Sequence, residues 1–364
     1  MLRLRVLEGW LMRYHGRGTP TAVTLRRTLM AAVLALAACG QPAQKTSADA
    51  AANAPPPVST APAAPEPIPE GQPGHIAIAA TFDEGGVFAE GLAPVRIGAR
   101  FGYIDKEGKT VIQPQFDFAS PFSEGLAAVS TGAKYGYIDK QGNFAITLNF
   151  EVANLFSFSE GLAAVRIGEY LTGKWGYIDK KGTIVIKAQF DTAGSFSDGL
   201  AVVAVNGKWG YIDNKGRFAI RPQFTSAGSF SDGLASVRMG DFITGKDGYI
   251  DKKGKIVIEP QFDAAFPFKD GLADVRVGEK YGFIDRQGKI VIAPEFDFAD
   301  SFSNGLAAFR KGDETTGKYG YIDKEGEIAV NPQFDFVDMF STSDGLAAFR
   351  SGDDQIGKFG YLAR

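Results

Sequence analysis

A nine-residue segment, KWGYIDKKG at residues 174–182, recurs with small changes along most of the chain and limits the fold more than any other feature. Its core is an aromatic residue followed by Gly-Tyr. Aligned on that core, the chain has eight copies, which begin at Phe101, Tyr135, Trp175, Trp209, Asp247, Tyr281, Tyr319 and Phe359. Successive copies start 34 to 40 residues apart, and a period of about 20 to 50 residues is typical of repeat architectures. The sequence therefore predicts a chain built from eight structural units.

The beginning of the chain has the pattern of an exported protein. Arg26 and Arg27 precede an apolar run at 28–38 that is too short to span a bilayer, which predicts a signal peptide over residues 1–38. Leu-Ala-Ala at 36–38 precedes Cys39, the single cysteine of the chain, and this arrangement resembles a bacterial lipobox. The resemblance implies lipidation of Cys39 in the cell envelope. Because Gly40 rather than Asp follows the cysteine, it also implies the outer membrane, with the protein facing the periplasm.

Residues 39–74 differ in composition from the rest of the chain. They are rich in Ala, Pro and Ser and nearly free of large apolar side chains, so they predict a disordered tether. From residue 75 to 364 the composition is rich in glycine and aromatic residues without interruption, which predicts one repeat domain. The formal net charge of −3 is close to neutral and does not suggest a nucleic acid partner.

Each unit contains three short candidate strands in a meander. In the unit at Trp175 these are GLAAV at 161–165, the WGYID segment and IVI at 184–186. An Asp-x-x-Gly sequence follows the second strand and predicts a tight turn in which the aspartate accepts backbone hydrogen bonds. The alternative is that these aspartates form ligand or metal sites; they are Asp105, Asp139, Asp179, Asp213, Asp251, Asp285 and Asp323.

The connection between the first and second strands has two lengths. The leucine of the first strand lies nine residues before the aromatic position in four units and thirteen in the other four. Insertions confined to one loop of each repeat usually fall on one face, which is often the binding face. The candidate binding residues in the long loops are Tyr170, Thr172, Asp241, Phe242, Asp313, Glu314, Asp353 and Gln355.

Two further patterns predict contacts within and between units. A PQFD segment and a second phenylalanine follow the third strand, as in Phe116 and Phe122, and these rings are expected to pack neighbouring units together. The alternative is an exposed aromatic ladder for sugars. An arginine ends the first strand in six units, where it can stack on the aromatic position. In the unit at Asp247 an acid replaces the ring, so a salt bridge with Arg238 is expected instead.

The consensus K-[WYF]-G-[YF]-I-D-x-x-G, followed by P-x-F-D and F-S-[ED]-G-L-A, resembles the WG repeat, also called the KWG repeat, of bacterial proteins. The resemblance covers residues 76–364. This sequence departs from the pattern at Asp247, at 148–151 where PQFD is absent, and at 361–364 where the turn aspartate is missing. The resemblance implies a binding or scaffolding array and assigns no catalytic residue.

The order of the strands favours a closed ring. The chain begins with a third-type strand at 76–78 and ends with a second-type strand, so the first strand could complete the last unit, as in β-propellers. The expected fold is therefore all-β, with eight three-stranded antiparallel units in a propeller-like ring. An open β-solenoid is the alternative.

The expected function is a non-catalytic envelope lipoprotein that displays its repeats to a protein or glycan partner without a cofactor. A module for cell-wall polymer is the alternative. The chain has two histidines, His15 and His75, so a histidine-based triad or zinc site lacks its residues. A carboxylate-dependent hydrolase is the remaining enzymatic alternative.

Overall fold

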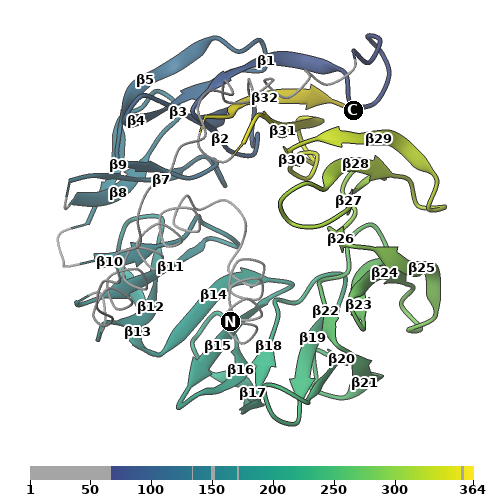
Figure 1. The fold of residues 1–364 in the computed structure, drawn as a ribbon. Helices are drawn as coiled ribbons and strands as arrows, with labels where there is room; N and C mark the ends of the chain where they lie inside the picture. Colours follow the sequence, from purple (N-terminus) through teal and green to yellow (C-terminus); the bar gives the residue numbers. More distant parts are fainter. Residues whose placement is uncertain (1–66, 133, 149–151, 170–171, 354–355) are drawn as a thin grey trace, which may run out of the picture. The chain divides into compact units, whose positions relative to one another are not determined.

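The structure is a computed structural model that describes residues 67–364, except 133, 149–151, 170–171 and 354–355. The predicted signal peptide, Cys39 and most of the tether lie outside these residues. Every regular element in the described part of the chain is a β-strand. The strands form eight four-stranded sheets arranged as blades around a ring, so the domain is an eight-bladed β-propeller (Figure 1).

Within each blade the four strands, A to D, are hydrogen-bonded in that order. The strands of blades 1 to 4 are β2 (Glu84–Gly85), β3 (Ala93–Ile97), β4 (Arg100–Ile104) and β5 (Thr110–Phe116); β6 (Phe118–Ala119), β7 (Ala127–Thr131), β8 (Lys134–Ile138) and β9 (Phe144–Thr147); β10 (Val152–Leu155), β11 (Leu162–Ile167), β12 (Lys174–Asp179) and β13 (Ile184–Phe190); and β14 (Thr192–Ser197), β15 (Leu200–Val205), β16 (Lys208–Ile212) and β17 (Phe218–Phe224). Those of blades 5 to 8 are β18 (Ser226–Ala227), β19 (Leu234–Met239), β20 (Lys246–Asp251) and β21 (Ile256–Phe262); β22 (Ala264–Ala265), β23 (Ala273–Val277), β24 (Lys280–Ile284) and β25 (Ile290–Phe296); β26 (Phe298–Ala299), β27 (Ala307–Lys311), β28 (Lys318–Ile322) and β29 (Ile328–Phe334); and β30 (Phe336–Val337), β31 (Leu346–Ser351), β32 (Lys358–Ala363) and β1 (Ile76–Phe82).

The prediction of three strands per unit was wrong by one strand. Strand A is the additional one, and in six of the eight blades it is only two residues long. In blade 2 it consists of Phe118 and Ala119, which pair with Ser130 and Val129. Two residues carry no period of alternation. Strand A therefore depends on pairing with strand B and leaves no recognisable pattern in the sequence.

The ring closes where the sequence analysis expected. Strand β1 pairs with β32, with Ile76 opposite Leu362 and Phe82 opposite Phe359, and it serves as strand D of blade 8. The prediction of a propeller-like ring is thereby confirmed, and the open solenoid is not observed. The residues that precede β1 meet the end of β32 where a C–D turn would otherwise lie, because the Ala363 amide donates to His75 O and the Gly74 amide donates to Ala363 O. No continuous turn exists there, which explains why the last unit lacks the turn aspartate.

The core lies between neighbouring blades. The tyrosine that follows the motif glycine is fully buried against a phenylalanine of the following blade, as for Tyr103 and Phe122, whose ring centroids are 4.9 Å apart. The Tyr103 hydroxyl donates to Ser120 O in the next blade at 2.8 Å. Phe116 and Phe122 are 1% and 2% exposed, so these phenylalanines belong to the core and do not form an exposed ladder.

The glycine of the Trp-Gly dipeptide is required by a bulge in strand D. The pairing of β12 with β13 shifts register between Trp175 and Tyr177. This bulge brings the outer strand so close that a Cβ on Gly176 would lie 2.5 Å from Ile186 O and 2.7 Å from Ala188 N. Real Cβ atoms are not found at such distances from backbone atoms. Only glycine therefore fits beneath the outer strand at this position.

The seven turn aspartates cap their own turns, as predicted. The Asp179 carboxylate accepts hydrogen bonds from the amides of Lys181 and Thr183, both at 2.9 Å. Gly182 closes the turn with a φ of +77°. A carboxylate of the same position accepts a backbone amide in the other six turns, at Asp105, Asp139, Asp213, Asp251, Asp285 and Asp323.

Candidate binding face

Strand direction places all eight B–C connections at one end of the ring. Because adjacent strands are antiparallel, the B–C loops and the segments that link one blade to the next share one face, and the A–B and C–D turns share the other. We call these the loop face and the turn face. The four long B–C loops, at residues 168–173, 240–245, 312–317 and 352–357, are therefore all on the loop face, in blades 3, 5, 7 and 8.

The aspartate of PQFD joins neighbouring blades on the loop face. One carboxylate oxygen of Asp297 accepts a hydrogen bond from Lys280 Nζ of blade 6 at 2.6 Å. The other accepts a hydrogen bond from the Gly312 amide in the B–C loop of blade 7 at 2.9 Å. The Lys280 position is the lysine of the KWG signature, so the signature lysine has a structural partner. The same bridge occurs at Asp83, Asp117, Asp191, Asp263 and Asp335. No role was predicted for this aspartate from the sequence, although it follows its cation by 17 residues in every bridge except the one between Lys358 and Asp83 at the ring closure.

These bridges predict a loss of stability in acid. Hydrogen bonds from Lys174 and Lys280 are the main reason that the pKa values of Asp191 and Asp297 lie below their ordinary value. A carboxylate with a lowered pKa stabilises the folded state above the unfolded value of about 4, and this contribution is lost as the pH falls through the folded-state pKa. The pairs are partly exposed, so each contributes less than about 1 kcal/mol.

We therefore expect the melting temperature to stay level from about pH 7 to pH 5 and to fall below about pH 4. Asp191→Asn should lower stability at neutral pH and flatten the acid slope in thermal melts. Thr225→Asp should steepen the slope, because Thr225 occupies the bridging position in blade 5 and Lys208, before it, has no carboxylate partner among the described residues. An acid slope that neither substitution changes would contradict this role of the bridges.

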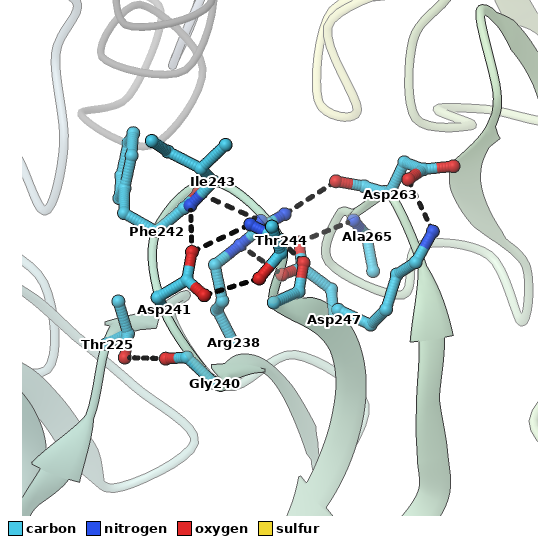
Figure 2. A network of polar contacts seen from close by, with 12 residues as sticks. Thr225, Arg238, Gly240, Asp241, Phe242, Ile243, Thr244, Asp247, Asp263 and Ala265 are labelled. Atoms are coloured by element: carbon cyan, nitrogen blue, oxygen red, sulfur yellow. Dashed lines mark hydrogen bonds and ion pairs between the residues drawn. The ribbon is translucent and has the colours of Figure 1, made fainter.

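Blade 5 carries the predicted salt bridge. Arg238 Nε lies 2.8 Å from Asp247 Oδ1, and the two side chains are 8% and 1% exposed. Burial raises the pKa of Asp247, although the Arg238 guanidinium acts in the opposite direction. The guanidinium also donates to Gly245 O at 2.8 Å, to Phe242 O at 3.3 Å and to the backbone oxygen of Asp263 (Figure 2). The ion pair is therefore connected to both sides of the 240–245 loop.

In blade 7 the corresponding arginine has the predicted aromatic neighbours. Arg310 lies over the rings of Phe298 and Tyr319 at 5.8 and 5.7 Å. In blade 1, Arg96 instead pairs with Glu84 at 2.8 Å. The guanidinium covers ring faces in blade 7, which favours packing over recognition at this position.

The structure places six of the eight candidate binding residues. Asp241, Asp313 and Asp353 accept backbone amides of their own loops, so their carboxylates hold the loops in shape. Hydrogen bonds from the Thr244 hydroxyl and from loop amides lower the pKa of Asp241 to about 2. Thr172 and Glu314 are exposed and Phe242 is half-buried. Tyr170 and Gln355 lie outside the described residues.

Two residues that are prominent on this face were not among the candidate binding residues predicted from the sequence. Ile243 and Ile356 are 75% and 77% exposed, the highest values among the large apolar side chains described. Their signal in the sequence is an apolar residue inside a polar loop tip, which is weak without a measure of exposure.

Two further features bear on the class of protein. Among the described residues, no group of three or more His, Cys, Asp or Glu side chains is arranged to hold a metal ion. In the same part of the chain, no helix is long and apolar enough to cross a membrane. The prominent features of the loop face are shaped loops and blade contacts rather than converging reactive groups.

Together, the ring of eight blades and the loop face define a repeat β-propeller. The chain belongs to the family described as WG containing repeat, which matches at residues 74–100, 101–135, 135–170, 175–209, 209–241, 248–281, 281–314 and 319–353. The resemblance noted from the motif is thereby confirmed. No curated protein sequence matches the chain.

Comparison with solved structures finds similar chains at low sequence identity. A crystal structure of the eukaryotic initiation factor is similar with a TM-score of 0.52 and 11% identity, over 80% of this chain and 87% of that one. KlHsv2 with loop 6CD replaced by a Gly-Ser linker has a TM-score of 0.43 and 9% identity, over 79% and 98% of the two chains. PorZ of Porphyromonas gingivalis has a TM-score of 0.39 and 11% identity, over 77% and 43%. The first similarity supports the fold alone.

Proposed function

We propose that this protein is a non-catalytic, lipid-anchored scaffold of the cell envelope that binds a protein partner with its loop face. The observation that carries the proposal is the position of the long loops relative to the point where the chain enters the domain. Ile76 begins β1 opposite Leu362, near the end of β32. That end belongs to the turn face. The tether therefore joins one face of the ring, and the four long loops project from the other.

This geometry suits a protein held near a membrane by its N-terminal side. A flexible tether of about 35 residues has an end-to-end distance of roughly 30 to 35 Å. Such a reach would leave the loop face free to meet a partner away from the membrane. The family match supports a repeat scaffold, and the lipobox-like sequence before Cys39 supports the anchor and the envelope location.

The cell-wall polymer alternative has less support on this face. Aromatic side chains do form a continuous series through blades 6 to 8, in which Tyr281, Phe298, Tyr319, Phe336 and Phe359 follow one another at 5.7 to 6.1 Å. Their rings pack on one another, and Arg310 and Arg350 lie over three of them. Sugar binding needs free ring faces, so this series is better explained as packing.

The anchor predicts that Cys39→Ser abolishes incorporation of labelled fatty acid and releases the protein from membranes. The measurement is fractionation of cells that express the two forms, with fatty-acid labelling in parallel. Retention of the Cys39→Ser form in the membrane fraction would argue against a lipid anchor at this residue. Recovery of the unsubstituted protein in the inner membrane would argue against the outer-membrane location.

The binding face predicts that shortening the long loops removes binding. The chain supplies the replacement, because the B–C hairpin of blade 4 is the two-residue turn Asn206-Gly207, with both residues at positive φ. Replacing residues 168–173, 240–245, 312–317 and 352–357 by Asn-Gly should leave a folded domain that no longer recovers its partner from envelope extract. The readouts are thermal melting and affinity recovery with the full chain.

Recovery of the same partner by the shortened chain would place the binding site elsewhere. Retention on purified cell wall, lost on shortening, would favour the polymer alternative instead. In a matched control the four loops keep their length, and serine replaces three exposed residues of the outer strands. These residues are Val111, Val185 and Val257, each 47% exposed.

A further inference from the structure

Two isoleucines on the loop face are far more exposed than any other large apolar side chain in the described part of the chain. Ile243 and Ile356 are 75% and 77% exposed, whereas the next values are 47%. Both are in long loops, in blades 5 and 8. A single half-exposed apolar residue is common on protein surfaces, but an aliphatic side chain held almost wholly in water at the tip of a loop is unusual.

The loop with Ile243 is held in one shape by its own hydrogen bonds. Asp241 Oδ1 accepts the amides of Ile243 and Thr244, both at 2.8 Å, and its other oxygen accepts the Thr244 hydroxyl. The Gly245 amide donates to Asp241 O at 3.0 Å. Outside the loop, the Thr225 hydroxyl donates to Gly240 O at 2.5 Å. The isoleucine is therefore presented by a structured loop in which the amides of Ile243, Thr244 and Gly245 have partners.

The buried ion pair of blade 5 adds a second support for this loop. Arg238 donates to Phe242 O and Gly245 O, and Asp247 holds the guanidinium in place at 2.8 Å (Figure 2). Asp247 also accepts the Ala265 amide at 3.0 Å. In the other copies of the motif the position of Asp247 is aromatic. A buried ion pair is weak evidence for stability, so its presence here is better explained by the loop it positions.

Rigid presentation of an apolar side chain lowers the entropic cost of binding, because the loop does not have to be ordered when the complex forms. We propose that residues 240–245 form a preformed knob that inserts Ile243 into an apolar socket on a partner protein. Ile356, in the 352–357 loop, is a second knob on the same face. This inference rests on the proposed function and names the contact through which that function is exercised.

The charges around the loop favour a protein over a membrane or a glycan. Arg238 is paired with Asp247, and Lys246 is paired with Asp263 at 2.5 Å. Segments that bind anionic bilayers combine apolar residues with cations that are available to the lipid, and here the two cations that flank the loop in the sequence, Arg238 and Lys246, have carboxylate partners. An isoleucine side chain has no hydrogen-bonding group with which to recognise a sugar. An apolar socket lined by a protein is the complement that remains.

The test places a photo-crosslinking amino acid at position 243 of the full chain in the envelope. Position 257 is the control, since Val257 is an exposed residue of the same blade. We expect a discrete protein adduct from position 243 and none from 257. Added unlabelled chain should compete for this adduct, whereas the Ile243→Ser chain should not. With the captured protein purified, Ile243→Ser should weaken binding by at least about tenfold, and Val257→Ser should not change it.

Melting temperatures separate loss of binding from loss of folding. Ile243→Ser should have the melting temperature of the parent protein, because the side chain is exposed. Asp247→Tyr removes the ion pair with Arg238 that supports the loop and leaves residues 240–245 unchanged. If Ile243→Ser binds the captured protein as tightly as the parent, the knob is wrong while the proposed function stands. If no adduct forms from 243 or from Glu314 in the 312–317 loop, the proposed function fails as well. The Cys39→Ser chain can also be sedimented with phosphatidylglycerol vesicles. If it sediments with them and the additional Ile243→Ser substitution abolishes this, the knob binds a bilayer and the proposal of a protein partner is wrong.

Discussion

Replacing Gly176 with alanine should lower the free energy of unfolding by about 3 kcal/mol. The added methyl group would lie 2.5 Å from Ile186 O and 2.7 Å from Ala188 N, and both are backbone atoms of the bulged outer strand. A side chain could rotate away from such a contact, but these atoms move only if the bulge and its pairing with β12 shift. Chemical denaturation of the purified domain measures the change.

The control for this substitution is Gly161→Ala in the same blade. Gly161 has a φ of +79°, and a Cβ there would meet nothing within 4 Å. Alanine at that position therefore measures backbone strain alone, which costs about 1 to 2 kcal/mol. Equal losses for the two substitutions would mean that the outer strand yields easily, and the explanation of the Trp-Gly signature by close approach would be wrong.

Removing residues 75–82 should destabilise all eight blades together. This deletion removes β1, which supplies strand D of blade 8 and pairs with β32. It also removes the buried side chains of Ile78 and Phe82. In a closed ring every blade has two neighbours, so a broken closure weakens the one cooperative structure. Deletion should give a single melting transition at a lower temperature, with faster hydrogen exchange at Tyr361.

A milder substitution keeps the test informative if the deleted chain does not fold. Phe82 in blade 8 and Phe262 in blade 5 occupy the same position of strand D and are 8% and 3% exposed. Phe→Ala in a core costs about 3 to 5 kcal/mol, and closure predicts similar losses at the two sites. A clearly smaller loss for Phe82→Ala, or unchanged exchange at Tyr361 in the deleted chain, would show that the ends are only loosely joined.

The contacts at the closure show why the ends should behave like any other junction. Lys358 of blade 8 pairs with Asp83, and the Tyr361 hydroxyl donates to Gly86 O in blade 1 at 2.9 Å. On the turn face, Lys106 of blade 1 pairs with Asp344 of blade 8 at 2.8 Å. These are the same kinds of contact that join consecutive blades elsewhere. The junction between blades 8 and 1 is therefore held on both faces and in the core.

The signature residues of the repeat now have separate physical explanations. The lysine pairs with the PQFD aspartate that leads into the next blade, as Lys280 does with Asp297. The glycine leaves room for the bulge of strand D, and the tyrosine ties its blade to the next one through its hydroxyl. Each of these contacts occurs in nearly every blade, so the consensus describes how blades join. Function has to be sought in what differs between blades, which is the length and content of the B–C loops.

The sequence by itself determined the number of units, the strands B, C and D and the Asp-x-x-Gly turns, and it favoured the closed ring that the pairing of β1 with β32 confirms. Each of these leaves a periodic or local pattern: the spacing of the motif, alternation along a strand, a turn residue at a fixed offset. The expected position of the arginine beside the aromatic residue is also found in the first hairpin, where Arg96 lies opposite Phe101.

Tertiary structure alone decided strand A, the role of the PQFD aspartate and the exposure of Ile243. Strand A is two residues long in most blades and exists because strand B offers it a partner. The aspartate acts between blades, where its two oxygens reach groups that belong to different repeats. The exposure of Ile243 depends on how Asp241 and the Arg238–Asp247 pair shape a loop. Such properties arise from contacts between segments, and a local pattern in the sequence does not record them.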